Sequence, residues 1–277
     1  MCIRDSHLAH VHVPHPPTAL IGSTPFQFEG MNLDAYDDHD RDREKDYMAA
    51  LAGRLTEAYP VPVDTALLEG EVPSALAQYA KEIRADAVVL STHSRTGPKR
   101  AWMGSVAEGM IRSGSFPILV VHADEAADIG EPLDIQRILV ALDGSELSET
   151  ILAPAAELAQ ACEARLTLLH VLSTGQTEPG GMIPTNPDQW THALEEGESY
   201  LEGLAGRLRR RRIPVDTVVM AHPEPGRAIR EVAEEDRADL IAMATHGYTG
   251  IRRVLFGSVA EDVLRHCRVP MLIRRPT

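Results

Sequence analysis

Two glycines and a serine in the last third of the chain have the spacing of an anion-binding loop. The segment reads Ala244-Thr-His-Gly247, then nine residues, then Gly257-Ser258. Glycine lets backbone N–H groups approach phosphate oxygens closely. A Gly-Ser pair that opens a helix directs free N–H groups and the positive end of the dipole at an anion. The spacing favours a phosphate site, but Ser258-Val-Ala-Glu261 is also a capping box, which would explain the serine without a ligand.

The apolar run Arg137–Leu142 is followed by the turn residues Asp143-Gly144-Ser145, and Asp143 places a carboxylate directly after the run. This pattern predicts a buried strand that turns into a helix. Asp143 could face a ligand at the end of the strand, or Asp143 or Ser145 could simply cap the helix. The phosphoacceptor of a receiver domain is disfavoured, because the acidic pair, later acceptor and lysine of such a site are not placed that way.

The elements that would position these residues alternate between apolar strands and amphipathic helices. After Ser145 the sequence predicts helices over 148–164, 189–212, 225–236 and 258–266, and strands over 165–172, 214–221, 238–244 and 269–275. Pro154 should kink the first helix or shift its start, and a Gly/Pro loop is expected over 176–187. Strands that are apolar on both faces indicate an α/β fold, in which helices cover a parallel sheet.

The first half of the chain repeats the second. Residues 85–122 align without a gap with residues 238–275, at an offset of 153, and LAHVHV around His10 resembles LLHVLS around His170. On this register the counterpart of Arg137 would lie before Met1, so the first copy lacks its opening strand. The expected organisation is a leader at 1–6, a truncated domain at 7–123, a linker at 124–136 and a complete domain at 137–277.

The composition narrows the class of protein. Lys and Arg total 27 against 41 Asp and Glu, a net charge of −14, which disfavours partners such as nucleic acids and anionic membranes. Only 4% of the residues are aromatic, so the core must be built from Leu, Ile, Val and Ala. The three cysteines show no CxxC spacing, and no apolar run approaches the ~20 residues that span a bilayer. A cytoplasmic protein is predicted.

On these motifs the chain resembles a tandem universal stress protein, over most of residues 7–123 and 137–277. The nucleotide-binding branch of that family carries G-x2-G-x9-G-[S/T]. The second copy has this spacing with Ala244 in place of the first glycine, whereas the first copy has Ser91 and Ser94 where the first two glycines belong. The resemblance implies that the second copy binds ATP or a similar adenine nucleotide, with or without Mg²⁺, across the carboxyl ends of its first and fourth strands.

The resemblance also implies the roles of single residues in this site. Phosphates would lie on Gly247, Gly257, Ser258 and Val259, the ribose on Asp143, and the base between Ala141, Leu142 and Val171. Met243, Ala244 and His246 complete the expected nucleotide-binding set, in which His246 would orient the loop or contact the ligand. No nucleophile–base–acid set surrounds these residues, so at most slow ATP hydrolysis is expected. Arg252 and Arg253, between the glycines, could reach phosphates or only solvent.

The family further implies a doubly wound, five-stranded parallel sheet in the order 3-2-1-4-5. The first copy would then lack its central strand, and its second and fourth strands would either pair directly or keep unpaired edges. We expect the sequence to be a fragment of a longer tandem protein. The last strands of the two copies would pair antiparallel as an intrachain pseudo-dimer, and a homo-oligomer is conceivable. The alternative function is a dimerisation scaffold that needs no ligand.

Two clusters of polar residues have ordinary structural explanations. His7, His10, His12 and His15 invite a zinc site, but no Cys or convergent carboxylate pattern completes a tetrahedral set, so surface and strand-end histidines are expected. The charge run from Asp34 to Asp46 lacks the Gly and Glu spacing of an EF-hand and is interpreted as a solvated helix start.

Overall fold

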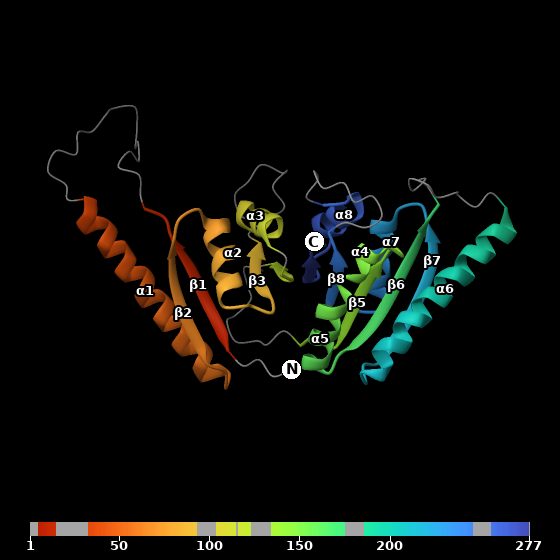
Figure 1. The fold of residues 1–277 in the computed structure, drawn as a ribbon, viewed down its shortest axis with the longest axis horizontal. Helices are drawn as coiled ribbons and strands as arrows, with labels where there is room; N and C mark the ends of the chain where they lie inside the picture. The colour runs from red at the N-terminus through yellow and green to blue at the C-terminus, as the bar shows by residue number, and fades with distance from the viewer. Residues whose placement is uncertain are drawn as a thin grey trace, which may run out of the picture. The chain divides into compact units, whose positions relative to one another are not determined.

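The computed structural model describes residues 5–14, 33–92, 104–114, 116–122, 134–174, 186–245 and 256–276. In chain order its elements (Figure 1) are β1 (Ser6–His12), α1 (Leu33–Ala58), β2 (Val63–Glu69), α2 (Val72–Glu82), β3 (Val88–Thr92), α3 (Ser105–Ser113), β4 (Ile118–His122), β5 (Arg137–Leu142), α4 (Glu146–Glu149), α5 (Leu152–Cys162), β6 (Arg165–Ser173), α6 (Pro187–Arg210), β7 (Val215–His222), α7 (Pro225–Glu235), β8 (Leu240–Ala244), α8 (Ser258–His266) and β9 (Met271–Arg274).

The chain separates into two compact units. The smaller unit comprises Cys2–Ile83, and the larger unit comprises Arg84–Thr277. The boundary at Ile83 falls inside the predicted domain 7–123, and β1 begins at Ser6, one residue before that domain. The division follows the sheets, because β1 and β2 form one sheet and the other described strands form a second.

The sheet of the larger unit contains the strands predicted for the second half of the chain. Its order is β3-β4-β9-β8-β5-β6-β7, so β5 lies at the centre of the second half, between β6 and β8. The strands β5 to β9 pair with one another in parallel, whereas β9 pairs with β4 antiparallel. These alternating strands and helices confirm the predicted α/β fold.

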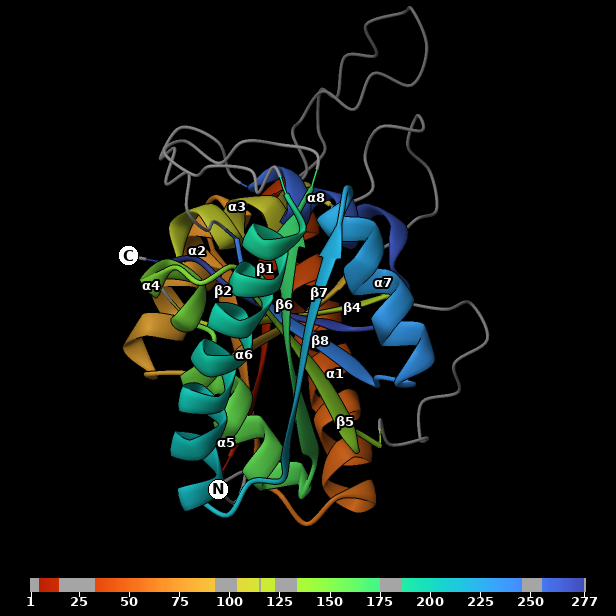
Figure 2. The ribbon, with the colours of Figure 1, turned by 90° about the vertical axis from the view of Figure 1, so that its right-hand side faces the viewer.

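Helices cover both faces of this sheet. On one face, Ile138 and Val140 of β5 pack in a single core with α5 and α6, through residues such as Ile151, Leu201 and Leu204. On the other face α7 packs on β6 and on α8. Figure 2 shows α5 and α6 along one side of the sheet and α7 along the other. The central strand is therefore buried on both faces, as its continuous apolar sequence requires.

The predicted helix over 148–164 forms as two pieces. The short helix α4 ends at Glu149, and α5 starts at Leu152, so Pro154 lies in the first turn of α5. Proline is tolerated there because the first-turn N–H groups have no partner within the helix. The expected shift of the helix start at Pro154 is confirmed.

In the first copy, β1 and β3 do not pair directly with each other in the described part of the chain. Among the described residues β1 pairs only with β2, in parallel, and β3 pairs only with β4. Their repeat counterparts in the second copy, β6 and β8, both flank β5. Each of these strands therefore keeps one edge without a strand partner in the described part of the chain.

Candidate functional site

The candidate site lies at the carboxyl ends of β5 and β8, which are adjacent and parallel in the larger unit. Ala141 of β5 is the register partner of Met243 of β8, and Leu142 is that of His170 in β6. Parallel neighbours end at the same edge of a sheet, and open α/β sheets bind ligands at this edge. Asp143 follows β5, Val171 lies in the last third of β6 and Ala244 ends β8, so the three residues lie toward the carboxyl ends of adjacent strands.

The helix α8 begins at this edge with a glycine in the capping position. Gly257 has φ −66° and ψ 157°, and no side chain caps the helix. Its N–H donates to the carbonyl of Thr245, at the end of β8, over 2.7 Å. Thr245 is itself fully buried, so this bond holds the start of α8 against the end of the strand.

The predicted capping box at Ser258 is wrong. Ser258 is the first residue within α8, one position past the cap, and its side chain is exposed. Ser105 occupies the same position in α3, where Gly104 is the cap. Gly257 is the N-cap because its N–H is bonded to Thr245 at the end of the preceding strand. Ser258 therefore becomes the first residue within the helix. Within the described residues, no N-cap side chain bonds the first-turn N–H groups of α8, and a helix N-terminus of this kind favours an anion.

Asp143 closes the turn that follows β5. Its Oδ1 accepts hydrogen bonds from the N–H of Ser145 at 3.0 Å and from its hydroxyl at 2.6 Å. The hydroxyl oxygen of Ser145 accepts in turn from the N–H of Ser148, and Gly144 between them has φ 87°. The capping interpretation of this segment is therefore confirmed for Ser145, the N-cap of α4.

The remaining predicted residues differ in what they can present to a ligand. The side chains of Ala141, Leu142, Met243 and Ala244 are buried, whereas Val171 and Val259 are half-buried. Buried side chains leave backbone groups as the polar atoms at this edge. His246, Gly247, Arg252 and Arg253 lie outside the described residues. In the part of the chain that the structure describes, no helix is long and apolar enough to cross a membrane.

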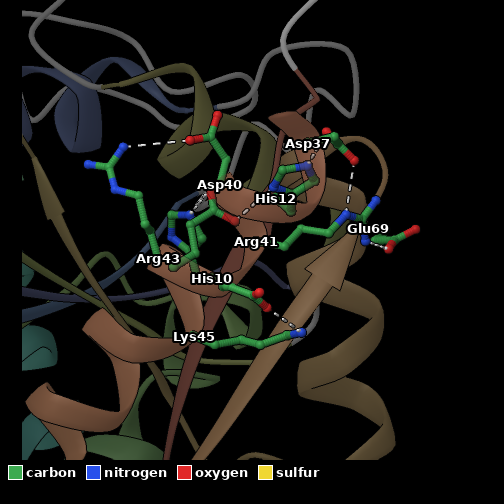
Figure 3. Close-up of polar contacts among 10 residues, drawn as sticks. His10, His12, Asp37, Asp40, Arg41, Arg43, Lys45 and Glu69 are labelled. Atoms are coloured by element: carbon green, nitrogen blue, oxygen red, sulfur yellow. Dashed lines mark hydrogen bonds and ion pairs between the residues drawn. The ribbon is translucent and has the colours of Figure 1, made fainter. Parts of the chain in front are cut away.

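A second polar cluster, in the smaller unit, was not predicted. His12 is only 1% exposed and lies between two carboxylates of α1. Its Nε2 contacts Oδ1 of Asp37 and its Nδ1 contacts Oε2 of Glu44, both at 2.8 Å. Figure 3 shows Arg41 beside them, between Asp37 and Glu69 of β2. His12 is the last residue of β1, as the strand-end interpretation expected, but it is buried and not at the surface.

The residue spacing in α1 explains this cluster. Asp37, Arg41 and Glu44 lie four and three residues apart and so share one face of the helix. His10 and His12 alternate along β1 and share one face of that strand, and His10 also contacts Glu44, at 3.4 Å. The sequence therefore contained evidence for this cluster. That evidence was the spacing of Asp37, Arg41 and Glu44 on one helical face, and not the charged composition of the run. Within the described ranges, no group of three or more His, Cys, Asp or Glu residues is arranged to hold a metal ion.

Both ring nitrogens of His12 face carboxylate oxygens, so both act as donors and the ring is the positively charged imidazolium. The hydrogen bonds to Asp37 and then to Glu44 raise the pKa of His12. The hydrogen bond from His12, and next that from Arg41, lowers the pKa of Asp37. Burial pushes the pKa of Glu44 upward, but the hydrogen bond and charge of His12 outweigh it, and that pKa is also lowered.

Comparison with known proteins identifies the family. The model of the universal stress protein family matches residues 4–122 and 134–275. Universal stress protein Rv2005c of Mycobacterium tuberculosis is 32% identical over 194 residues, which cover 69% of this chain and 62% of that protein. Universal stress protein Rv2623 of the same organism is 28% identical over 277 residues, covering 99% of this chain and 88% of the relative.

A solved structure shares the fold. The crystal structure of a universal stress protein from Archaeoglobus fulgidus superposes with a TM-score of 0.62 at 20% identity, covering 89% of this chain and 81% of that one. The family model matches both halves of the chain, and the alignment with Rv2623 runs through nearly all of it. The chain therefore belongs to the universal stress protein family.

Proposed function

We propose that the second half of the chain binds an adenine nucleotide, ATP with or without Mg²⁺, and that the protein is a nucleotide-binding regulator of the stress response. One observation carries the proposal. The start of α8 is held by Gly257 at the carboxyl end of β8, directly beside the end of β5, and no side chain caps it. Phosphates would lie on the first-turn N–H groups of α8, and Asp143 would face the ribose.

The residues at this edge fit such a ligand. A Cβ atom built on Gly257 would lie 3.4 Å from the carbonyl oxygen of Thr245, which is an ordinary van der Waals contact. A side chain would therefore fit at this position, and its absence leaves the backbone at the start of α8 uncovered. The hydroxyl of Tyr200, on α6, is buried and makes no hydrogen bond within the described residues. Burial first, and then the nearby carboxylates of Glu149 and Asp143, raise the pKa of Tyr200, so it stays a neutral donor. A polar ligand near Asp143 would satisfy a group whose isolation costs ~1–3 kcal/mol.

The experiment compares the two capping glycines of the repeat. In Gly257→Val, the added methyl groups would cover the first-turn N–H groups of α8, and we expect affinity for ATP to fall about a hundredfold or more. The φ of −66° is allowed for valine, so the variant should fold. Gly104→Val is the matched control, because Gly104 has the same φ and caps α3 in the first copy, which has no β5 counterpart in the described residues.

Binding is measured on the full chain by competition with a fluorescent ATP analogue, with ATP, AMP and cyclic AMP as competitors, in Mg²⁺ or in EDTA. Unchanged binding by Gly257→Val, with its circular dichroism intact, would overturn the proposal. An equal loss of ATP affinity in Gly257→Val and Gly104→Val would also contradict the proposal, because the effect would then not be specific to the second half of the chain.

A second candidate is a scaffold that needs no ligand, and the antiparallel pairing of β4 with β9 favours it. In this function the last strands of the two copies protect each other's edges as an intrachain pseudo-dimer. The scaffold predicts no saturable nucleotide binding and an unchanged cellular phenotype for Gly257→Val. The same variant therefore separates the two functions.

A further inference from the structure

Arg274 ends β9 and directs its side chain to the segment that follows α4. Its Nη1 donates to the carbonyl of Thr150 over 3.1 Å, and the residue is half-buried. The strand itself does not require an arginine at this position, because the counterpart in the first copy, at the offset of 153, is Val121 in β4. The bond to Thr150 therefore has another role than to form the strand.

The carbonyl of Thr150 requires a donor from outside its own helix. Thr150 follows α4, and in a continuous helix its carbonyl would accept from the N–H of the fourth residue along the chain. That residue is Pro154, which has no N–H. Arg274 supplies a donor to this carbonyl. The arginine thus fixes the end of α4 at the point where the proline interrupts the helix.

A series of hydrogen bonds connects Thr150 to Asp143. The hydroxyl of Thr150 donates to the carbonyl of Leu147 over 2.6 Å. The buried hydroxyl of Ser148 donates to the carbonyl of Ser145 over 2.8 Å and accepts from the N–H of Asp143 over 3.4 Å. Ser145 in turn donates to the carboxylate of Asp143. Because α4 is little more than one turn long, a displacement of its end would also displace this carboxylate.

The backbone of Arg274 supports the other side of the candidate site. Its carbonyl accepts from the N–H of Thr245 over 2.9 Å, and the carbonyl of Thr245 accepts from Gly257 at the start of α8. One residue therefore holds the helix start through its backbone and the turn of Asp143 through its side chain. A substitution removes only the side-chain connection, so the two sides of the site can be tested separately.

We propose that Arg274 is a positioning residue for ribose recognition, which holds the turn after β5 so that the carboxylate of Asp143 faces the ribose hydroxyl groups. This role rests on the proposed nucleotide site. The phosphates stay with the first-turn N–H groups of α8, whose support by the backbone of Arg274 does not depend on its side chain.

Ribose recognition is measured on the full chain as the ratio of the dissociation constants of 2′,3′-dideoxy-ATP and ATP, each obtained by competition with the fluorescent analogue. For the unchanged chain we expect a ratio of about ten or more, because a hydrogen bond to a charged group is lost with the hydroxyls. Arg274→Met keeps the unbranched stem but removes the donor, and the ratio should fall to about three or less.

Three further variants separate this role from a loss of charge. Arg275→Met is the matched control, since Arg275 is the next residue and bonds the carbonyl of Arg112 in α3, and its ratio should stay within about twofold of the unchanged chain. Arg274→Lys keeps a charged donor and should keep a ratio above about five. In Asp143→Ala the ratio should be about one, and adding Arg274→Met should not lower it further.

Hydrogen–deuterium exchange of the chain without nucleotide tests the positioning bond alone. Amides of residues 143–151 should exchange faster in Arg274→Met than in the unchanged chain, because the end of α4 is no longer held. Amides of α8 should keep their exchange rates, because the backbone bonds through Thr245 remain.

Equal ratios in Arg274→Met and the unchanged chain, or equal exchange over residues 143–151, would overturn the proposal. A loss of affinity by the same factor for ATP and for 2′,3′-dideoxy-ATP would also overturn it, because Arg274 would then act on a part of the ligand other than the ribose. If the unchanged chain binds no ATP, the proposed function is wrong and the role in ribose recognition is overturned with it, whereas the exchange data still show whether Arg274 holds the turn.

Discussion

Truncation of Ile241 to alanine is expected to lower the free energy of unfolding of the larger unit by about 2–5 kcal/mol. Ile241 is fully buried in β8, between β5 and β9, and helices cover the sheet, so the cavity cannot be filled from solvent. The repeat provides a matched control in Val88, the counterpart of Ile241, which is half-buried and has β4 on one side only. Val88→Ala should cost about 1 kcal/mol or less.

Urea denaturation followed by circular dichroism measures both changes. The comparison tests whether the second copy buries this position more completely than the first, as the structure shows. Equal costs for Ile241→Ala and Val88→Ala would contradict that difference in burial.

The second large effect concerns pH and the cluster around His12. Because the folded-state pKa of His12 is raised, its contribution to stability is complete below the unfolded value of about 6.5 and is lost as pH rises through the folded value. The pKa values of Asp37 and Glu44 are lowered, so their contributions are complete above about 4.5 and are lost as pH falls through the folded values. The cluster therefore stabilises the smaller unit most between about pH 4.5 and 6.5. Its other polar neighbours are Arg41, His10 and Glu69.

His12→Phe should remove the decline in stability above about pH 6.5 and destabilise the smaller unit by roughly 2 kcal/mol near pH 6. Hydrogen–deuterium exchange of α1 amides, corrected for the intrinsic effect of pH, measures the change locally. His192→Phe is the control, since His192 lies exposed on α6 beside Glu196, and it should leave the profile of α1 unaltered. An identical pH profile in His12→Phe and the unchanged chain would contradict a positively charged His12 ring in the fold.

The sequence predicted the second half well because its signals are local and strong. Apolar runs such as Arg137–Leu142 are too short for helices and are bounded by turn residues, and α7 and α8 begin at the predicted residues. The position of Pro154 predicted the break between α4 and α5, because the effect of proline on a helix depends only on local backbone chemistry. These features can be predicted without knowing which helices and strands contact one another in the fold.

The two errors arose where a distant contact decides the outcome. Serine is the better cap by propensity, but the bond from Gly257 to Thr245 fixes the glycine in that position, and the strand end that accepts it is twelve residues away. His12 and its carboxylates are separated by 25 and 32 residues, so composition alone could not pair them. A helical projection of Asp37, Arg41 and Glu44 against the alternation of β1 would have suggested the contact.

The central claim is that the edge formed by β5, β8 and the start of α8 binds an adenine nucleotide. Calorimetric titration of ATP with Mg²⁺ into the full chain tests it most directly. We predict saturable heat with one site per chain, since in the described part of the chain it is the second copy that places a central strand beside its glycine-capped helix. No saturable heat, or two equivalent sites per chain, would contradict this account.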